Sequence, residues 1–358
     1  MTAERNSFRS SKRLLIVRLD SIGDYVLFRN FLPAIRNHFQ YHTVSICGNA
    51  CWRTLAEQLD AGEIQSFIWV NKPLFNRYGW YRWLLLQRLK MSKYDVVLHP
   101  VHSREFWVDH LIKKIPAPLK IGSRGDLSCM YADDKNESDK VYNHLVDVEP
   151  PSVFEFHRNG TFVKHLVGQP LPSIRLNMNL PEMISPKSPY VVLAPGAGHE
   201  MKKWSPLGYA QVADHVITTM DMNVVMGGGV EDRAIARDIQ MSVKSSLDRV
   251  INMVGRLSLT EYANVIKQSK MLVSNDSCAI HMAAAVSTPF VCISTGREMG
   301  RFNPYPADVF QSCRFVFSNQ SRRDGDLSSD DSLTNWDLNR ITAVDVIQAI
   351  NELQTIVA

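Results

Sequence analysis

The chain has 358 residues, of which 45% are hydrophobic and 21% charged, with a formal net charge of +4. This composition is typical of a soluble globular protein, and the length exceeds one ordinary hydrophobic core, so two domains are expected. The small net charge argues against a general nucleic-acid-binding protein, although it is compatible with a local basic patch. The apolar run that follows the basic N-terminus ends at Arg18, which is too short for a signal peptide, and no run reaches transmembrane length. The six cysteines include no C-x-x-C pair, which favours reduced thiols in a cytoplasmic protein.

Strands and helices are expected to alternate along the first part of the chain. Short apolar runs predict strands, and apolar residues at helical spacing predict the helices between them. The expected strands are 14–19, 43–47, 66–70 and 95–100, and the expected helices are 25–39, one after Cys51, 78–91 and 105–115. This alternation is typical of a doubly wound α/β domain with a parallel sheet.

The loop after the first expected strand carries Asp20, Ser21, Gly23 and Asp24. It lies at the carboxyl end of that strand, where open α/β sheets bind their ligands. An aspartate at a helix start is also a common N-cap. The residues alone therefore leave a functional and a capping role open for Asp24.

The segment 75–93 combines aromatic and basic residues, with tryptophans at 80 and 83 between five lysines and arginines. A helix of this kind can lie on an anionic membrane. The alternative, which we favour, is that Leu84, Leu85, Leu86 and Leu89 face the core while the cations cover the rim.

The alternation weakens between 127 and 169, where DDKNESDK is expected to be a solvated turn. Five prolines between 170 and 189 then indicate an interdomain linker. We therefore predict a first domain over 1–170, a linker over 171–189 and a second domain over 190–358.

The second domain is expected to repeat the same architecture, with a ligand cleft between the two domains. The expected strands are 190–194, 223–226, 250–253, 271–274 and 290–294, and the expected helices are 207–220, one ending near 243, one opened by the capping box at 258–261, 278–286 and 342–356. An aspartate cluster in the polar segment 318–336 is too irregular for an EF-hand, so we expect a solvated loop there and no metal site.

The expected βαβ unit over 271–295 carries the most chemistry. Asp276 or Ser277 can cap its helix, whose start offers free backbone N–H groups and a partial positive charge that suit a phosphate. His281 lies one turn further along, on the same helix face as Ser277. The alternative is that Asp276 only caps the helix and His281 is a half-buried structural histidine.

Two further loops at the carboxyl ends of strands complete a candidate nucleotide-sugar site. PGAGHEMKKW offers glycines for close backbone approach and Lys202 and Lys203 for phosphate charge. GGGVEDR offers Glu231 and Asp232, whose carboxylates can accept hydrogen bonds from ribose hydroxyls. The first strand is not followed by G-x-G-x-x-G and no phosphate-binding G-x-x-x-x-G-K-S/T occurs, which disfavours a dehydrogenase or a P-loop enzyme.

In their order along the chain, four segments resemble glycosyltransferase family 9, the ADP-heptose:lipopolysaccharide heptosyltransferases and their relatives. They lie within residues 13–305 and read LLIVRLDSIGDYVLFRNFLPAIR, VVLAPGAGHEMKKWSP, VVMGGGVEDR and VGRLSLTEYANVIKQSKMLVSNDSCAIHMAAAVSTP. The resemblance implies a GT-B architecture of two Rossmann-like domains, with the acceptor on the first and the nucleotide-sugar on the second. It also implies inverting transfer without a catalytic metal or other cofactor.

The resemblance further implies roles for individual residues. Asp24 corresponds to the proposed general base of the family. The residues implied on the donor diphosphate are Lys202, Asp276, Ser277, Cys278, His281, Gly196, Ala197 and Gly198; those implied at the nucleoside are Gly228, Glu231, Asp232 and Leu257; those implied on the acceptor side are Ser21, Gly23, His99 and His102. The expected partners are an ADP-sugar and a lipopolysaccharide or other lipid-linked glycan, met in the cytoplasm with peripheral contact at the inner membrane face.

The chain departs from the family pattern at several positions. Cys278 replaces a glycine, the sequence of 99–102 differs from the acceptor loop of relatives, and 294–306 replaces another family element. Two alternatives remain: a nucleotide-sugar epimerase or hydrolase on the same fold, and a non-catalytic nucleotide-sugar-binding protein.

Overall fold

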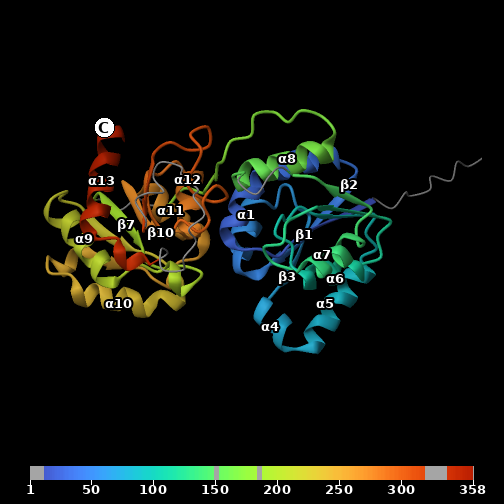
Figure 1. The fold of residues 1–358 in the computed structure, drawn as a ribbon, viewed down its shortest axis with the longest axis horizontal. Helices are drawn as coiled ribbons and strands as arrows, with labels where there is room; N and C mark the ends of the chain where they lie inside the picture. The colour runs from blue at the N-terminus through green and yellow to red at the C-terminus, as the bar shows by residue number, and fades with distance from the viewer. Residues whose placement is uncertain (1–11, 149–152, 184–187, 319–336, 358) are drawn as a thin grey trace, which may run out of the picture. The chain divides into compact units, whose positions relative to one another are not determined.

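Two six-stranded parallel sheets, each flanked by helices, form the architecture of the chain in a computed structural model (Figure 1). The structure describes residues 12–148, 153–183, 188–318 and 337–357. The chain folds into two compact units. The first comprises Met1–Ser21, Phe31–Pro150 and Arg158–Ser173, and the second comprises Ile22–Asn30, Pro151–His157 and Ile174–Ala358. The predicted α/β class is confirmed.

The first unit is built on a sheet with the strand order β3-β2-β1-β4-β5-β6. Its strands are β1 (Lys12–Arg18), β2 (His42–Asn49), β3 (Ser66–Val70), β4 (Val96–His99), β5 (Leu119–Ser123) and β6 (His144–Val146). Leu14 to Val17 of β1 are fully buried, as expected for a central strand that is covered on both faces. The strand order reverses between β1 and β4, which makes their carboxyl ends the switch point of this sheet.

Helices cover this first sheet, and α4, α5 and α6 pack on it through apolar side chains. They are α2 (Leu32–His38), α3 (Arg53–Leu59), α4 (Lys72–Arg77), α5 (Gly79–Met91), α6 (Phe106–Lys113), α7 (Ala132–Asp139) and most of α8 (Glu155–Val167). One core cluster joins Leu15 and Val97 of the sheet to Leu89 of α5 and Ile112 of α6. The apolar stripes of α5 and α6 therefore anchor these helices to the sheet.

Three predictions for the first half were wrong. The expected helix 25–39 is divided into α1 (Ile22–Phe28), a 3-10 turn (Arg29–Phe31) and α2, because Pro33 in the first turn of α2 has no N–H and its ring obstructs a continuous helix. The expected turn DDKNESDK lies almost entirely in α7, where Asp133 and Asp134 stand in the first turn and favour a helix start. The strands β5 and β6 were missed because one mixes Lys and Gly with apolar residues and the other has three residues.

The second unit repeats the topology, with the strand order β12-β11-β10-β7-β8-β9. Its strands are β7 (Tyr190–Ala194), β8 (Asn223–Met226), β9 (Val250–Asn252), β10 (Met271–Asn275), β11 (Phe290–Ser294) and the unpredicted β12 (Cys313–Phe317). Its helices are α1, α9 (Pro206–Thr218), α10 (Arg233–Ser242), α11 (Leu259–Gln268), α12 (Cys278–Ala285) and α13 (Ala343–Val357). The switch point of this sheet lies between β7 and β10.

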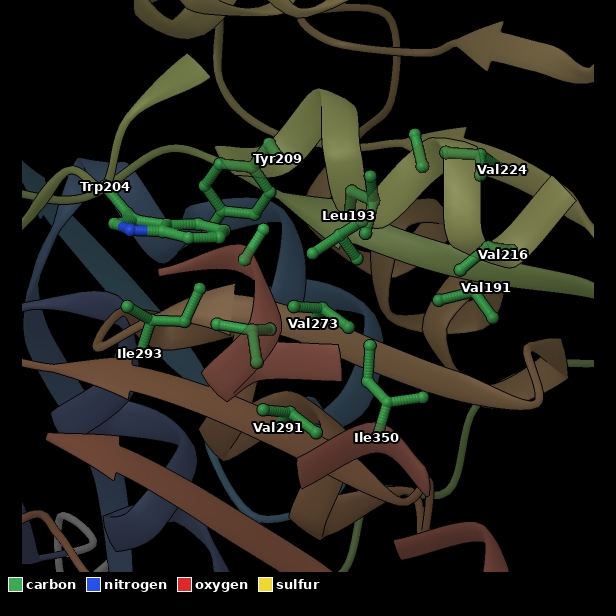
Figure 2. Close-up of a cluster of buried hydrophobic side chains, with 14 of the residues drawn as sticks. Val191, Leu193, Trp204, Tyr209, Val216, Val224, Val273, Val291, Ile293 and Ile350 are labelled. Atoms are coloured by element: carbon green, nitrogen blue, oxygen red, sulfur yellow. The ribbon is translucent and has the colours of Figure 1, made fainter. Parts of the chain in front are cut away.

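The core of the second unit is shown in Figure 2. Val191 and Leu193 of β7 lie among Val216 of α9, Val273 of β10 and Ile350 of α13, all of them buried. The Trp204 ring meets the Tyr209 ring edge-on with centroids 5.1 Å apart, and its Nε1 donates to the Ile341 carbonyl oxygen. This indole therefore ties the loop after β7 to the segment that leads into α13.

Two other predictions concern helix caps and linkers. The capping box at 258–261 is confirmed: the Glu261 carboxylate accepts from the Ser258 N–H, and the Ser258 hydroxyl accepts from the Glu261 N–H. The described residues of 171–189 hold no helix or strand, and the domain boundaries stay a prediction. The aspartate cluster of 318–336 lies outside the described residues. Among the helices that the structure describes, none has the length and apolar content needed to cross a bilayer.

Candidate active site

The switch point of the second sheet brings together the loops that follow β7 and β10. Ala194 and Ser274 pair near the ends of these adjacent parallel strands. Asn275, which ends β10 and is fully buried, donates from Nδ2 to the Pro195 carbonyl oxygen at 2.7 Å. Its Oδ1 accepts from the Trp204 N–H at 3.1 Å. One amide side chain thus holds the two ends of the PGAGHEMKKW loop to β10.

Lys202 projects from this loop toward carboxylates. Its Nζ lies 3.4 Å from Asp276 Oδ2 and 3.6 Å from Glu298 Oε1, and 25% of its side chain is exposed. The neighbouring Lys203 forms an ion pair with Glu200 of the same loop. Because adjacent side chains diverge, the loop aims Lys202 at the end of β10 and keeps Lys203 apart from it.

The start of α12 lies next to this cation. Ser277 is the N-cap of the helix, and its Oγ accepts from the Ala279 N–H at 3.3 Å. Asp276 does not cap α12; its Oδ2 accepts from Asn303 Nδ2 at 3.1 Å and pairs with Lys202. The backbone N–H groups and the partial positive charge of the helix start are therefore combined with an ammonium group. This combination suits a diphosphate.

Cys278 is the first residue of α12. Burial raises the pKa of its thiol to about 11, so the thiol stays protonated at neutral pH. A protonated thiol is a weak nucleophile, which gives this cysteine no covalent role.

His281 is 5% exposed, and its Nδ1 lies 2.6 Å from the hydroxyl oxygen of Tyr305. The pKa of His281 is lowered to about 4, chiefly by burial; the negative charge of Asp24 opposes this shift and the positive charge of Lys202 adds to it. His281 is therefore neutral at physiological pH. Burial also raises the pKa of Tyr305, so the phenol keeps its proton.

The first turn of α1 packs against α12 within the second unit. A Cβ built on Gly23 would lie 2.5 Å from His281 Cδ2 and 3.6 Å from the Cα of Cys278. Such a distance to a buried ring is shorter than real contacts, so the glycine permits this close approach. Asp24, the next residue, is half-buried and affects the pKa of His281. The predicted general base thus belongs to the same unit as Lys202 and α12.

The predicted nucleoside residues differ in their burial. Asp232 is buried, and its Oδ2 accepts from the Gly229 N–H at 2.9 Å. A Cβ on Gly196 would lie 2.2 Å from the same Oδ2, so this carboxylate links the loops after β7 and β8. Glu231 is exposed, and its carboxylate can reach a ligand. Among the other predicted residues, Gly198 is exposed, and Ala197, Gly228 and Leu257 are half-buried.

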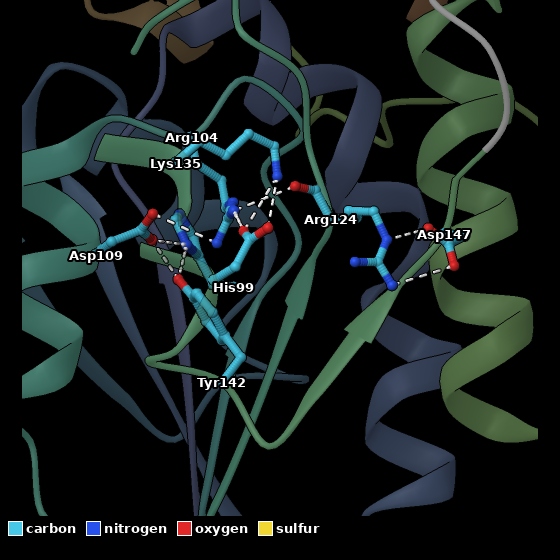
Figure 3. A network of polar contacts seen from close by, with 8 residues as sticks. His99, Arg104, Asp109, Arg124, Lys135, Tyr142 and Asp147 are labelled. Carbon is cyan, nitrogen blue, oxygen red and sulfur yellow. Dashed lines mark hydrogen bonds and ion pairs between the residues drawn. The ribbon is translucent and has the colours of Figure 1, made fainter. Parts of the chain in front are cut away.

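The predicted acceptor-side histidines lie in the first unit, at the carboxyl end of β4. His99 is 1% exposed; its Nδ1 is 2.6 Å from the Tyr142 hydroxyl oxygen and 3.2 Å from Asp109 Oδ1 (Figure 3). Arg104 NH1 lies 3.4 Å from Asp109 Oδ2, and the same guanidinium pairs with Asp139. Burial lowers the pKa of His99, which keeps the ring neutral.

Two further residues predicted on the acceptor side, His102 and Ser21, differ in environment. His102 is buried, with Nε2 3.5 Å from Asp126 Oδ2, whereas Ser21 is exposed after β1. In β1, the buried Arg18 forms an ion pair with Asp20 at 2.9 Å. Since His99 is enclosed, any effect of this ring on an acceptor is indirect.

The structure adds three residues that motif reasoning missed: Glu298, Asn303 and Tyr305. They contact Lys202, Asp276 and His281 respectively. All three belong to the segment that departs from the family pattern, so no motif indicated them. The concentration of polar and aromatic residues between 297 and 305, directly after a buried strand, was the available signal.

A cation site would need clustered ligands. Within the described ranges, no group of three or more His, Cys, Asp or Glu side chains is arranged to hold a metal ion.

Comparisons with known proteins identify relatives in sequence and in fold. Lipooligosaccharide heptosyltransferase 2 of Haemophilus influenzae is 29% identical over 130 residues, which cover 36% of this chain and 37% of that relative. The crystal structure of a glycosyl transferase family 9 protein from Veillonella parvula covers 96% of this chain and 97% of its own, with 17% identity and a TM-score of 0.73. An Escherichia coli heptosyltransferase solved with ADP covers 95% and 99%, with 15% identity and a TM-score of 0.72.

The fold of these structures confirms the predicted GT-B architecture. The curated relative is matched over little more than a third of its length. A sequence profile described as glycosyltransferase family 9 (heptosyltransferase) matches residues 82–326, which is more than half of the chain. This protein therefore belongs to glycosyltransferase family 9.

Proposed function

We propose that this protein transfers a heptose or related sugar from an ADP-sugar to a hydroxyl group of lipopolysaccharide or another cell-surface glycan. The proposal rests on one observation: at the switch point of the second sheet, Lys202 pairs with Asp276, the residue that precedes the N-cap of α12. A diphosphate needs positive charge and N–H donors, and both converge there. The names of the relatives support heptose as the sugar and ADP as the nucleotide.

In the proposed mechanism Asp24 is the general base. Its carboxylate takes the proton of the acceptor hydroxyl as that oxygen forms a bond to the anomeric carbon. The bond from that carbon to the diphosphate oxygen breaks on the opposite face, so the configuration inverts. The electron pair of the broken bond leaves with the diphosphate as ADP.

Lys202 and the N–H groups at Ser277–Cys278 stabilise the charge that develops on the leaving diphosphate. Asp276 and Asn303 hold the ammonium group in place, since Asp276 Oδ2 contacts both side chains. This arrangement supplies the charge neutralisation that a metal ion supplies in other glycosyltransferases.

Neutral His281 is close enough to both Asp24 and Lys202 for their charges to affect its pKa. A buried phenol needs an acceptor for its proton, and His281 Nδ1 is the partner that the Tyr305 hydroxyl meets. If the phenol donates, the imidazole carries its own proton on Nε2, next to Gly23 at the start of α1. We propose that this N–H helps to orient the reacting groups.

The nucleoside is assigned to the loops after β8 and β9. Glu231 is exposed and can accept hydrogen bonds from ribose hydroxyls. The Asp232 carboxylate instead accepts from the Gly229 N–H and lies close to the backbone of Gly196 and Gly228. The acceptor is assigned to the first unit, through Ser21 and the loop that carries His102. The reaction is proposed to take place in the cytoplasm, with peripheral contact at the inner membrane face.

Two measurements test the proposal together. Thermal unfolding is followed with ADP, UDP, GDP and CDP, because a ligand that binds the folded state raises its stability by mass action. We expect ADP to give the largest shift and Lys202→Ala to reduce it. Turnover of ADP-heptose is then measured with and without a lipopolysaccharide acceptor, and ADP and the glycan product are quantified.

Each alternative function predicts a different outcome. Release of ADP at the same rate without acceptor would indicate a hydrolase, and a changed nucleotide-sugar would indicate an epimerase. Nucleotide binding without turnover of any donor would indicate a non-catalytic binding protein. Any of these results would contradict the proposed transferase activity.

A further inference from the structure

The segment from 64 to 94 is unusual in its charge. It contains six basic residues, Lys72, Arg77, Arg82, Arg88, Lys90 and Lys93, and no Asp or Glu. The whole chain is nearly balanced, with 40 basic and 36 acidic residues. All of these cations except the half-buried Lys72, which pairs with Glu105 at 2.8 Å, are exposed. The helix pair α4–α5, whose place in the fold is labelled in Figure 1, therefore carries a local excess of positive charge.

The helix α5 has an inner apolar face that is accounted for by packing. Leu85 and Leu89 are buried, and Tyr81 and Leu86 pack against the same core. The Tyr81 hydroxyl donates to the Trp69 carbonyl oxygen, which anchors the first turn of the helix to β3. This part of the helix follows the packing alternative that the sequence favoured.

The same helix has a second apolar stripe on its opposite side. Trp80, Trp83, Leu84 and Met91 follow helical spacing, and with about 100° between successive residues they centre on the face opposite Leu85 and Leu89. Trp80 is 58% exposed, Trp83 59% and Leu84 51%; Met91 is also exposed. Leu84, which the packing alternative assigned to the core, faces outward. A surface helix of a globular protein normally has one apolar stripe, so the second one lacks a structural reason.

We propose that this outward stripe of α5, with the cations around it, is a surface that docks on an anionic membrane. Trp side chains favour the interface between headgroups and acyl chains, and Lys and Arg are attracted to acidic lipids. The absence of acidic residues from 64 to 94 gives the surface the charge complementary to such a bilayer. The helix has 13 residues and is too short to span a bilayer, so docking places it in the plane of the interface. The surface lies in the first unit and needs no donor, so its failure would leave the proposed transfer reaction standing with a soluble acceptor.

The experiment uses the full chain and vesicles, without nucleotide. Flotation and tryptophan fluorescence are measured with vesicles of phosphatidylglycerol and phosphatidylcholine, and with phosphatidylcholine alone. We expect binding to the anionic vesicles that weakens at high salt, because screening shortens the range of the attraction. Lipids brominated in the acyl chains should quench the fluorescence if Trp80 and Trp83 insert.

Matched variants distinguish membrane binding by the outward stripe from non-specific adsorption of exposed aromatic residues. Trp80→Ala/Trp83→Ala should reduce partitioning by at least about 10-fold, because two large apolar side chains no longer insert. The control Tyr41→Ala/Tyr131→Ala removes two exposed aromatic residues elsewhere in the first unit and should bind like the parent protein. Melting temperatures without ligand check that all variants are folded.

A second set of variants tests the charge. Arg77→Gln/Lys90→Gln/Lys93→Gln leaves Arg82 and Arg88, which donate to backbone carbonyl oxygens, untouched. Each cation near an anionic surface contributes about fivefold in partitioning, so this variant should bind about 100-fold more weakly. The control Lys113→Gln/Lys267→Gln/Lys270→Gln changes net charge equally and should have a much smaller effect.

Several results would overturn the proposal. These are no association with anionic vesicles at low salt, equal losses in the stripe and control variants, or self-association that depends on Trp80 and Trp83. Salt-sensitive binding to an RNA or DNA oligonucleotide without vesicle binding would assign the surface to nucleic acid instead.

Discussion

The two sheets share one strand order and therefore one switch point each, but the polar groups at these points are arranged differently. At the end of β4 in the first unit, His99, Asp109, Tyr142 and Arg104 are buried and lie within hydrogen-bond or ion-pair distance of one another. At the end of β10 in the second unit, Lys202 is a quarter exposed and lies beside the start of a helix.

This difference shows that charged groups at equivalent positions of one topology can have a structural role or a ligand-binding role. Charges that are enclosed and mutually paired hold their surroundings in a fixed geometry, and breaking one pair leaves an uncompensated ion. A partly exposed cation beside free N–H groups is available to a ligand. The position of a site on a shared fold is thus set by topology, while its function depends on which loops leave charge accessible. Five predictions test this contrast.

The largest effect is expected for Asp109→Ala in the first unit. The substitution leaves the buried Arg104 with less compensation and removes a partner of His99 and Tyr142. We expect a loss of about 3–5 kcal/mol in the free energy of unfolding, measured by urea denaturation. The exposed control Asp248→Ala should stay within about 0.5 kcal/mol. A loss below about 1 kcal/mol, or an equal loss of ADP affinity, would mean that the two switch points do not differ in this way.

Acid sensitivity of the second unit should depend on His281. Its pKa is about 4 in the folded state against an unfolded value of 6.5, so the unfolded state binds more protons between these values. Stability therefore falls as pH decreases through 6.5 toward 4, by about 3 kcal/mol from this group. Urea unfolding at pH 7 and pH 4 should show a correspondingly smaller fall for His281→Gln. An unchanged pH dependence would contradict the buried neutral imidazole. The pKa of His99 is also lowered by burial, so this residue should likewise make the first unit less stable as the pH decreases.

Asp24→Asn removes the base and keeps the size of the side chain. We expect turnover to fall by about 100-fold or more, with ADP affinity changed by less than about twofold. Initial rates and calorimetric titration with ADP measure the two effects. Turnover within a few-fold of the parent enzyme would leave Asp24 as a helix-start residue.

Lys202→Ala is compared with Lys203→Ala, since the two ammonium groups have different partners. The first variant should raise the KM for the donor by about 10-fold, equivalent to about 1.4 kcal/mol, and the second should have little effect. Steady-state kinetics with varied donor measure both. Equal effects would mean a diffuse basic loop in place of one oriented cation.

The smallest effect is expected for Tyr305→Phe, which removes the hydroxyl partner of His281 Nδ1. Loss of this hydrogen bond should cost about 1 kcal/mol of stability and reduce kcat a few-fold. Tyr209→Phe is a matched control: it removes a buried hydroxyl bonded to the Ala194 carbonyl oxygen, and it should lower stability without lowering kcat. Identical kinetic effects would give Tyr305 a purely structural role.

Strands that are buried on both faces were the most predictable elements. The ranges of β7, β8 and β11 agree with the prediction, because continuous apolar runs bounded by turns are typical of parallel sheets. The range of the partly buried edge strand β3 also agrees with the prediction. β6 and α7 were missed because a three-residue strand and a polar helix carry no periodicity that separates them from loops.

The candidate site was predictable where parallel strands bring their carboxyl ends together, as for Lys202 after β7 and Asp276 after β10. Contacts made by irregular segments could not be predicted from the sequence. Asn303 reaches Asp276 from a loop without motif or period, and Asn275 joins two loops through its amide group. The contact of α1 with α12 follows from packing between distant parts of the chain, which local patterns do not encode.

The close approach of Gly23 to His281 has a consequence for how this protein can change over evolution. A side chain at 23 collides with the ring at 281, so the two positions, far apart in sequence, cannot vary independently. Relatives that carry alanine at the first position should carry a smaller residue at the second, and a mutational path through Gly23→Ala alone should pass through a less fit intermediate. Relatives that keep histidine at the position of His281 are therefore expected to keep glycine at the position of Gly23.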